Sequence, residues 1–129
     1  MRGFYPYLLV GLGGFLGANL RFIVARLSAQ YLGIAFPYGT FIINITGSFF
    51  LGLIGTLLAQ RVILFGEEIR LAVSIGFLGA FTTFSTFEFE SHALFDNGNW
   101  MLGLTNLLAS LFAGLLAVRL GINLAAIKP

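Results

Sequence analysis

Polar and small side chains recur every third or fourth residue in two otherwise apolar segments of this 129-residue chain. The row in segment 36–59 comprises Thr40, Asn44, Ser48, Gly52 and Thr56, and the row in segment 100–120 comprises Gly103, Asn106, Ser110 and Gly114. Residues at these spacings lie on one face of a helix. Each row therefore predicts a polar stripe, which either lines a pathway or lets helices pack closely and hydrogen-bond.

Two polar residues lie deep within apolar segments. The carboxamide of Asn44 has four hydrogen-bonding positions and would find no partner in lipid, so it must face protein or water. Arg21 lies about two-thirds of the way along the first apolar segment, where a charged side chain either extends to the membrane surface or turns inward. An inward arginine stays protonated and supplies a fixed positive charge.

The segment 76–90, GFLGAFTTFSTFEFE, combines five phenylalanines, four hydroxyls, two glycines and two glutamates. Glycines followed by hydroxyl residues make a poor continuous helix, because hydroxyls can replace backbone partners. A break would free carbonyls, which coordinate cations. The phenylalanines either fill space or turn their electropositive ring edges toward an anion. Glu88 and Glu90 fall near the expected end of this helix and are either interfacial or functional.

The elements that must position these residues are membrane helices. Only 9% of the chain is charged and 58% is hydrophobic, far from the roughly 25% charged residues of soluble domains. Four segments, 7–27, 36–59, 71–89 and 100–120, are long enough to cross a bilayer, which takes about 20 residues. The sequence predicts one all-α domain over residues 1–129, with a break in the third helix and no cleaved signal peptide.

Several function classes are excluded by residue types. The chain has no cysteine and a single histidine, so thiol chemistry and Cys/His metal clusters are absent. Paired acids, or a nucleophile beside a base, are also missing, and an enzyme is therefore not expected. Nucleic acid is not an expected partner.

The basic residues are unevenly distributed between the two ends of the expected helices. One side holds Arg2, Arg61, Arg70, Arg119 and Lys128, and the other holds Arg26, with Arg21 if it is counted. Because basic loops tend to remain in the cytoplasm, this distribution predicts that both termini are cytoplasmic.

Three blocks of the sequence resemble the CrcB/Fluc family of small fluoride channels. They are GGFLGANLR at 13–21, GTFIINITGSFFLG at 39–52 and GFLGAFTTFSTFEFE at 76–90, with TTFSTF as the most specific part. The resemblance covers essentially the whole chain. It implies a passive channel that exports cytoplasmic fluoride and confers fluoride resistance, in the inner or plasma membrane. It also implies a dual-topology protein that forms an antiparallel homodimer with two fluoride pathways.

The resemblance also implies roles for individual residues. Backbone carbonyls of Gly79 and Thr82 would hold a structural sodium ion on the dimer axis, and Arg21 would bias the vestibule toward anions. Asn106 stands where some relatives have tyrosine. The implied fluoride pathway comprises Asn44, Phe84, Phe87, Ser110, Thr40, Ser85, Thr86, Glu90 and Asn106.

Alternatives remain open at this stage. The uneven basic residues allow a hetero-pair with an oppositely biased relative. A small proton-coupled exporter of organic cations would also be a four-helix antiparallel dimer, but it needs a titratable acid in its cavity, and the first helix has none. In a purely structural membrane subunit, Asn44 and Arg21 would only contact partner helices.

Overall fold

The structure, a computed structural model, describes residues 3–60 and 66–126, and every regular element in these ranges is helical. Four spans are long and apolar enough to cross a membrane, which confirms the expected number. Three of the basic residues used above to predict orientation, Arg2, Arg61 and Lys128, lie outside the described residues. The elements are α1 (Tyr5–Leu32), α2 (Tyr38–Ala59), α3 (Gly66–Ile69), η1 (Arg70–Leu78), α4 (Gly79–Phe81), α5 (Phe84–Asp96) and α6 (Trp100–Ala126).

The third span, Gly66–Asp96, is longer than the sequence predicted. It was expected to occupy 71–89, but α3 begins at Gly66 and α5 continues to Asp96. The two glutamates were therefore wrongly placed near a helix end: Glu88 and Glu90 lie inside α5. Polar residues after Phe89 made the segment look finished, whereas exposed side chains such as His92 and Asp96 simply cover the outer face of the same helix.

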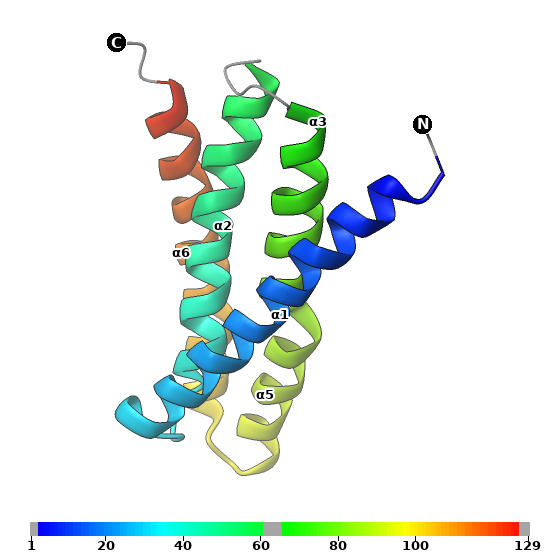
Figure 1. Ribbon diagram of the computed structural model, residues 1–129. Coiled ribbons are helices and arrows are strands. Elements are labelled where there is room, and N and C mark those ends of the chain that lie inside the picture. Colours follow the sequence, from blue (N-terminus) through cyan, green and yellow to red (C-terminus); the bar gives the residue numbers. More distant parts are fainter. Residues whose placement is uncertain (1–2, 61–65, 127–129) are drawn as a thin grey trace.

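Glycine lets α1 pack directly on η1. Added side chains at Gly13 and Gly17 would overlap the backbone carbonyls of Ala72 and Phe77 respectively. From the opposite helix, a Cβ on Gly76 would lie 2.6 Å from the Val10 carbonyl oxygen. The Gly-x-x-x-Gly face of the first segment is thus a helix contact, as that motif favours. Figure 1 shows α1 crossing the third span obliquely.

A second glycine contact joins α2 to α6. Side chains added at Gly52 and Gly121 would overlap the carbonyls of Val118 and Phe49 respectively. The two helices lie side by side along much of their length (Figure 1). The first contact thus holds α1 against the third span, and the second holds α6 against α2. The helix α2 in turn faces the third span.

The third span is interrupted at Thr82 and Thr83, which confirms the predicted break. Thr82 has φ −75° and ψ 156°, and Thr83 has φ −150° and ψ 120°, both extended. In Figure 1 the η1 and α5 parts lie end to end with the break between them. The nine residues of η1 before it form a π-helix, a wider turn that is rare and often found at functional sites. Nothing in the sequence analysis predicted it.

Candidate functional site

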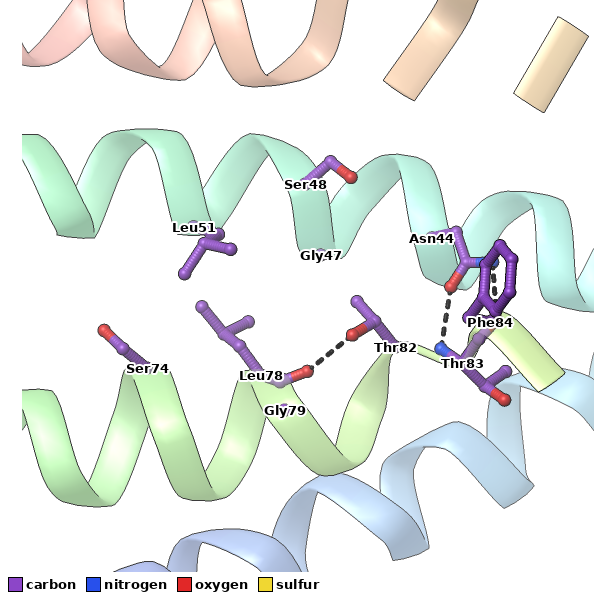
Figure 2. A pocket seen from close by; sticks show the side chains of 10 residues that line it. All are labelled: Asn44, Gly47, Ser48, Leu51, Ser74, Leu78, Gly79, Thr82, Thr83 and Phe84. Atoms are coloured by element: carbon purple, nitrogen blue, oxygen red, sulfur yellow. Dashed lines mark hydrogen bonds between the residues drawn. The ribbon is translucent and has the colours of Figure 1, made fainter. Parts of the chain in front are cut away.

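Asn44 on α2 holds the backbone at the break. Its Nδ2 donates to the Thr83 carbonyl at 3.0 Å, and its Oδ1 accepts from the Thr83 N–H at 2.9 Å. Figure 2 shows this carboxamide facing the backbone of Thr83. A carboxamide nitrogen carries two N–H groups, so the pair with Thr83 leaves one of them for a ligand. The polar residue that the sequence singled out thus contacts the one place where the third span stops being helical.

The break diverts two backbone donors. In a continuous α-helix the Thr83 and Thr86 N–H groups would bond the carbonyls four residues earlier, those of Gly79 and Thr82. Instead Thr83 N–H bonds Asn44, and Thr86 N–H donates to the Thr83 hydroxyl at 3.3 Å as an N-terminal cap of α5. The two carbonyls expected to coordinate a cation therefore lose these helical partners, and by the same spacing so do the carbonyls of Ala80 and Phe81.

A groove of about 280 Å³ runs between α2 and the third span beside the break. Its α2 wall and its third-span wall face each other in Figure 2. It is lined by Asn44, Gly47, Ser48, Leu51, Ser74, Leu78, Gly79, Thr82, Thr83 and Phe84. The Ser74 hydroxyl is buried and has no hydrogen-bond partner among the described residues. The groove thus brings two of the predicted pathway residues, Asn44 and Phe84, together with the predicted cation residues Gly79 and Thr82.

Phe84 and Phe87 begin α5 directly after the break. Their ring centroids are 6.1 Å apart with the planes tilted by 49°. The Phe84 side chain borders the groove yet is 74% exposed, and Phe87 is partly buried. Ser85 and Thr86 are exposed as well. The aromatic and hydroxyl residues of TTFSTF therefore lie on a surface of the single chain and are not enclosed by it.

Thr40 and Glu90 lie in a different place. Together with Tyr38 and Asn97 they border a second pocket, of about 270 Å³, between the connection of α1 to α2 and the C-terminal part of α5. Thr40 is 5% exposed, and one Glu90 carboxylate oxygen, Oε2, is buried with no hydrogen-bond partner among the described residues. The described chain does not bring these two residues into the groove at the break.

Asn106 and Ser110 form a third group with a residue that sequence reasoning missed. Asn106 Nδ2 donates to the Ser91 hydroxyl at 2.9 Å, and that hydroxyl donates to the Phe87 carbonyl at 2.7 Å. Ser110 donates to Asn106 Oδ1 at 3.3 Å. Asn106 is 1% exposed and Ser91 2% exposed. The fourth-segment stripe therefore contacts α5 at this level and does not stand open to solvent.

Arg21 stays separate from all three groups. It is partly buried on α1, and across residues 3–60 and 66–126 it makes no hydrogen bond or ion pair. The neighbouring Arg26 guanidinium lies 5.6 Å from the centre of the Phe22 ring. The groove, the Thr40 and Glu90 pocket and the Asn106 network thus divide the predicted pathway residues within one chain.

Comparison with known proteins identifies relatives that extend over nearly the whole chain. The family model described as "CrcB-like protein, Camphor Resistance (CrcB)" matches residues 8–122. The chain is 45% identical over 117 residues to a protein of Chloroflexus aurantiacus named "Fluoride-specific ion channel FluC", covering 91% of this chain and 92% of the relative.

Two further relatives give similar values. A protein of the same name from Koribacter versatilis is 46% identical over 112 residues, covering 87% of this chain and 88% of the relative. "Fluoride-specific ion channel FluC 1" of Methanosarcina acetivorans is 44% identical over 126 residues, covering 95% of each chain.

Proposed function

Because this chain belongs to the family of CrcB-like proteins, we propose that it is a fluoride-specific ion channel and trace the path to its groove. The chain is a multi-pass membrane protein and an ion channel, not an enzyme. The observation that carries the proposed path is the Asn44 carboxamide bonded across the helix break, beside the exposed Phe84 ring. We place it in the inner or plasma membrane of the cell.

The groups at the groove suit a small anion. Fluoride is strongly hydrated, so a path must replace water with several donors at once. The second N–H of Asn44 and the electropositive edges of Phe84 and Phe87 are such groups. None of them carries a full charge, and an anion held this way can also leave. The hydroxyls of Ser85 and Thr86, exposed on the same half-helix, extend the path.

Flow through this channel is passive. A membrane potential contributes about 2.3 kcal/mol per charge per 100 mV, which corresponds to roughly fiftyfold in concentration at 1.36 kcal/mol per decade. A cell with a negative interior would therefore expel fluoride without another energy source. Export of cytoplasmic fluoride, and resistance to it, follow from that direction.

Two copies in antiparallel orientation would complete the path. The groove at the break is open, and Phe84 is 74% exposed although it is a large apolar ring at membrane depth. A second copy related by a two-fold axis would cover both grooves with the same surface. This arrangement gives two pathways per dimer and brings together residues that one chain keeps apart, including Arg21 at a vestibule. A hetero-pair with a relative would present an equivalent surface.

A sodium ion suits the carbonyls of Gly79 and Thr82. Their helical donors are diverted, and hard cations prefer oxygen ligands. Within the described residues no group of three His, Asp or Glu side chains could hold a metal, and we assign the ligands to these backbone carbonyls. Equivalent carbonyls from a second copy would complete the coordination. The bound ion would neutralise carbonyl charge close to the path of an anion.

Purified protein in liposomes tests the function directly. We expect fluoride-loaded vesicles to release fluoride to an electrode much faster than protein-free vesicles, and to retain chloride. Replacing sodium by a large organic cation on both sides should lower the rate if the sodium site is correct. Release no faster than from protein-free vesicles would exclude a fluoride channel.

The absence of native cysteine allows a separate test of topology. Ala35 and Gln60 are exposed and lie beyond opposite ends of α2. In a dual-topology dimer, an impermeant thiol reagent should label Ala35→Cys and Gln60→Cys each in about half of the molecules. Labelling of one position only would show a single orientation and exclude the antiparallel pair, while leaving fluoride transport to its own assay.

A further inference from the structure

The backbone hydrogen-bond ladder of the third span does not continue across the break into α5, the half-helix that carries Phe84 and Phe87. Thr82 and Thr83 are extended, so the rotation of α5 about its own axis is not inherited from η1 and α4. One residue of an α-helix corresponds to about 100° of rotation at 3.6 residues per turn. A modest rotation of α5 would therefore turn the Phe84 ring away from the groove and reorient Phe87, so other contacts must set this rotation.

The first of these contacts lies at the start of α5 and the last near its end. Asn44 holds both backbone groups of Thr83. At the other end, Gly103 on α6 leaves room for the Phe95 ring, whose nearest atom would lie 2.5 Å from an added Cβ. Between them, the buried Asn106 bonds Ser91, and Ser91 bonds the Phe87 carbonyl. The helices α5 and α6 are antiparallel, joined by a short turn through Gly98 at φ 76°.

The Asn106 contact extends toward the predicted path. Because α5 and α6 are antiparallel, a step of about four residues back along α5 corresponds to a step of about four residues forward along α6. Phe95 with Gly103 and Ser91 with Asn106 follow this order, which puts Ser110 beside the turn of Phe87. Ser110 in turn donates to Asn106 Oδ1. One carboxamide thus bonds a hydroxyl proposed to face the anion and, through Ser91, is linked to the backbone carbonyl of the aromatic pathway residue Phe87.

We propose that Asn106 and Ser91 act together as positioning residues of the anion path, fixing the rotation of α5 and with it the orientation of Phe84 and Phe87. This inference rests on the proposed fluoride channel. It gives Asn106 a role different from the pathway wall that the resemblance implied, since a side chain 1% exposed and bonded at both ends of its amide has no surface to offer a passing ion.

Because the side chains of Asn106 and Ser91 are both buried, removing either one leaves a buried polar group of the other without this bond. A buried donor or acceptor left without a partner costs about 1–3 kcal/mol, and that cost is relieved if α5 rotates until the group finds water. Ser91→Ala breaks fewer hydrogen bonds than Asn106→Leu, because Asn106 keeps its bond with Ser110. We expect Ser91→Ala and Asn106→Leu each to lower fluoride efflux about tenfold per folded dimer, which corresponds to 1.36 kcal/mol.

Selectivity separates positioning from a merely structural role. We expect both variants to lose fluoride preference over chloride, because misplaced rings no longer exclude the larger anion. The double variant should be no slower than the slower single variant, since both changes break the same bond. Ser91→Thr retains a hydroxyl at the same place, so this variant should have the rate and selectivity of the wild type. Thr105→Leu, an exposed change one residue before Asn106, should behave as the wild type.

A second measurement does not depend on transport. Hydrogen exchange of backbone amides in residues 84–91 should be faster in Ser91→Ala than in the wild type, with α1 unchanged. Exchange unchanged in α5, or Ser91→Ala with normal rate and selectivity, would overturn the proposal. If Asn106→Leu does not fold, Ser91→Ala and Ser91→Thr decide the question. A wild type that carries no fluoride would overturn the channel, and the exchange experiment would then still judge whether this pair orients α5.

Discussion

Two kinds of helix contact in this molecule use small and polar residues in opposite ways. Where α1 meets η1 and α2 meets α6, glycines bring the backbone of one helix against the backbone of the other. Around the helix break, the Asn44 carboxamide and the hydroxyls of Thr83 and Ser91 form individual hydrogen bonds with backbone groups. Close backbone contacts tolerate no added atoms, whereas the polar contacts leave a groove open beside them.

The difference separates scaffold from site. Dispersion and close approach drive helix association in lipid, so the glycine contacts fix the frame without using hydrogen-bonding groups. Backbone that is not helical at membrane depth is tolerated only where it is buried in protein or lines a cavity. Asn44 supplies part of that shelter for the break. Substitutions at the glycine contacts should therefore prevent folding. Substitutions at the break should lower conduction in a protein that still folds.

The largest effect is expected in the frame, at Gly76. A Cβ there would lie 2.6 Å from the Val10 carbonyl oxygen and 3.1 Å from the Gly13 Cα, and backbone cannot move aside as a side chain can. We expect Gly76→Leu to cost at least the top of the about 1–3 kcal/mol range for overpacking, and to abolish the monodisperse protein peak in size exclusion.

Gly11 provides the matched control for Gly76, because an added side chain there would meet nothing within 4 Å. Gly11→Leu should give the wild-type yield and unfolding temperature. A stable, conducting Gly76→Leu protein would show that the α1–η1 contact is not part of the frame.

The next effect is expected at the break, for Asn44→Asp. Aspartate has nearly the same shape, but when ionised it only accepts hydrogen bonds, so the Thr83 carbonyl loses its donor and the anion meets a negative charge. We expect fluoride flux to fall about a hundredfold, equivalent to about 2.7 kcal/mol, in a protein with the wild-type elution profile. Liposome efflux and size exclusion on the same preparation measure both quantities.

Thr46→Val on the same helix is the control, because the Thr46 hydroxyl bonds only carbonyls of its own helix. Loss of assembly in Asn44→Asp, with flux per dimer unchanged, would instead make Asn44 a part of the frame.

The sequence predicted the frame better than the arrangement of the site. Helix number, a break in the third segment and a protein partner for Asn44 follow from local properties: apolar length, hydroxyl density and a carboxamide without a partner in lipid. Ser91 could not be found this way, because a lone serine after Glu90 has no local signal, and its partner Asn106 is fifteen residues away. The separation of Thr40 and Glu90 from the groove likewise depends on how helices cross, which no single segment determines.

A smaller effect is expected for the aromatic edge at the groove. Phe84→Ile keeps an apolar side chain but removes the electropositive ring edge, and we take the loss to be comparable with the about 0.5–1.5 kcal/mol of one aromatic pair. We expect fluoride flux to fall by up to about tenfold, with little change in the stability of the single chain, since this ring is 74% exposed.

Phe89→Ile tests whether that loss is specific. Phe89 lies on the same half-helix and is also 74% exposed, but it does not border the groove. The Phe89→Ile variant should therefore conduct fluoride at the wild-type rate. Equal losses in the two variants would mean that aromatic packing against lipid or a second copy, and not the groove, limits the flux.

The smallest effect is expected for Thr82→Val. This variant tests whether backbone carbonyls or side chains bind the cation at the break. The Thr82 hydroxyl donates to the Leu78 carbonyl at 2.9 Å, a carbonyl that already accepts the Thr82 N–H. Valine has the same shape and, being β-branched, suits the extended backbone at this position. If the cation is held by carbonyls, sodium dependence should persist and flux should change less than about twofold, or 0.4 kcal/mol. A variant that conducts without sodium, or not at all, would make the hydroxyl a ligand, and the break would then bind its ion with a side chain, as it holds its backbone with Asn44.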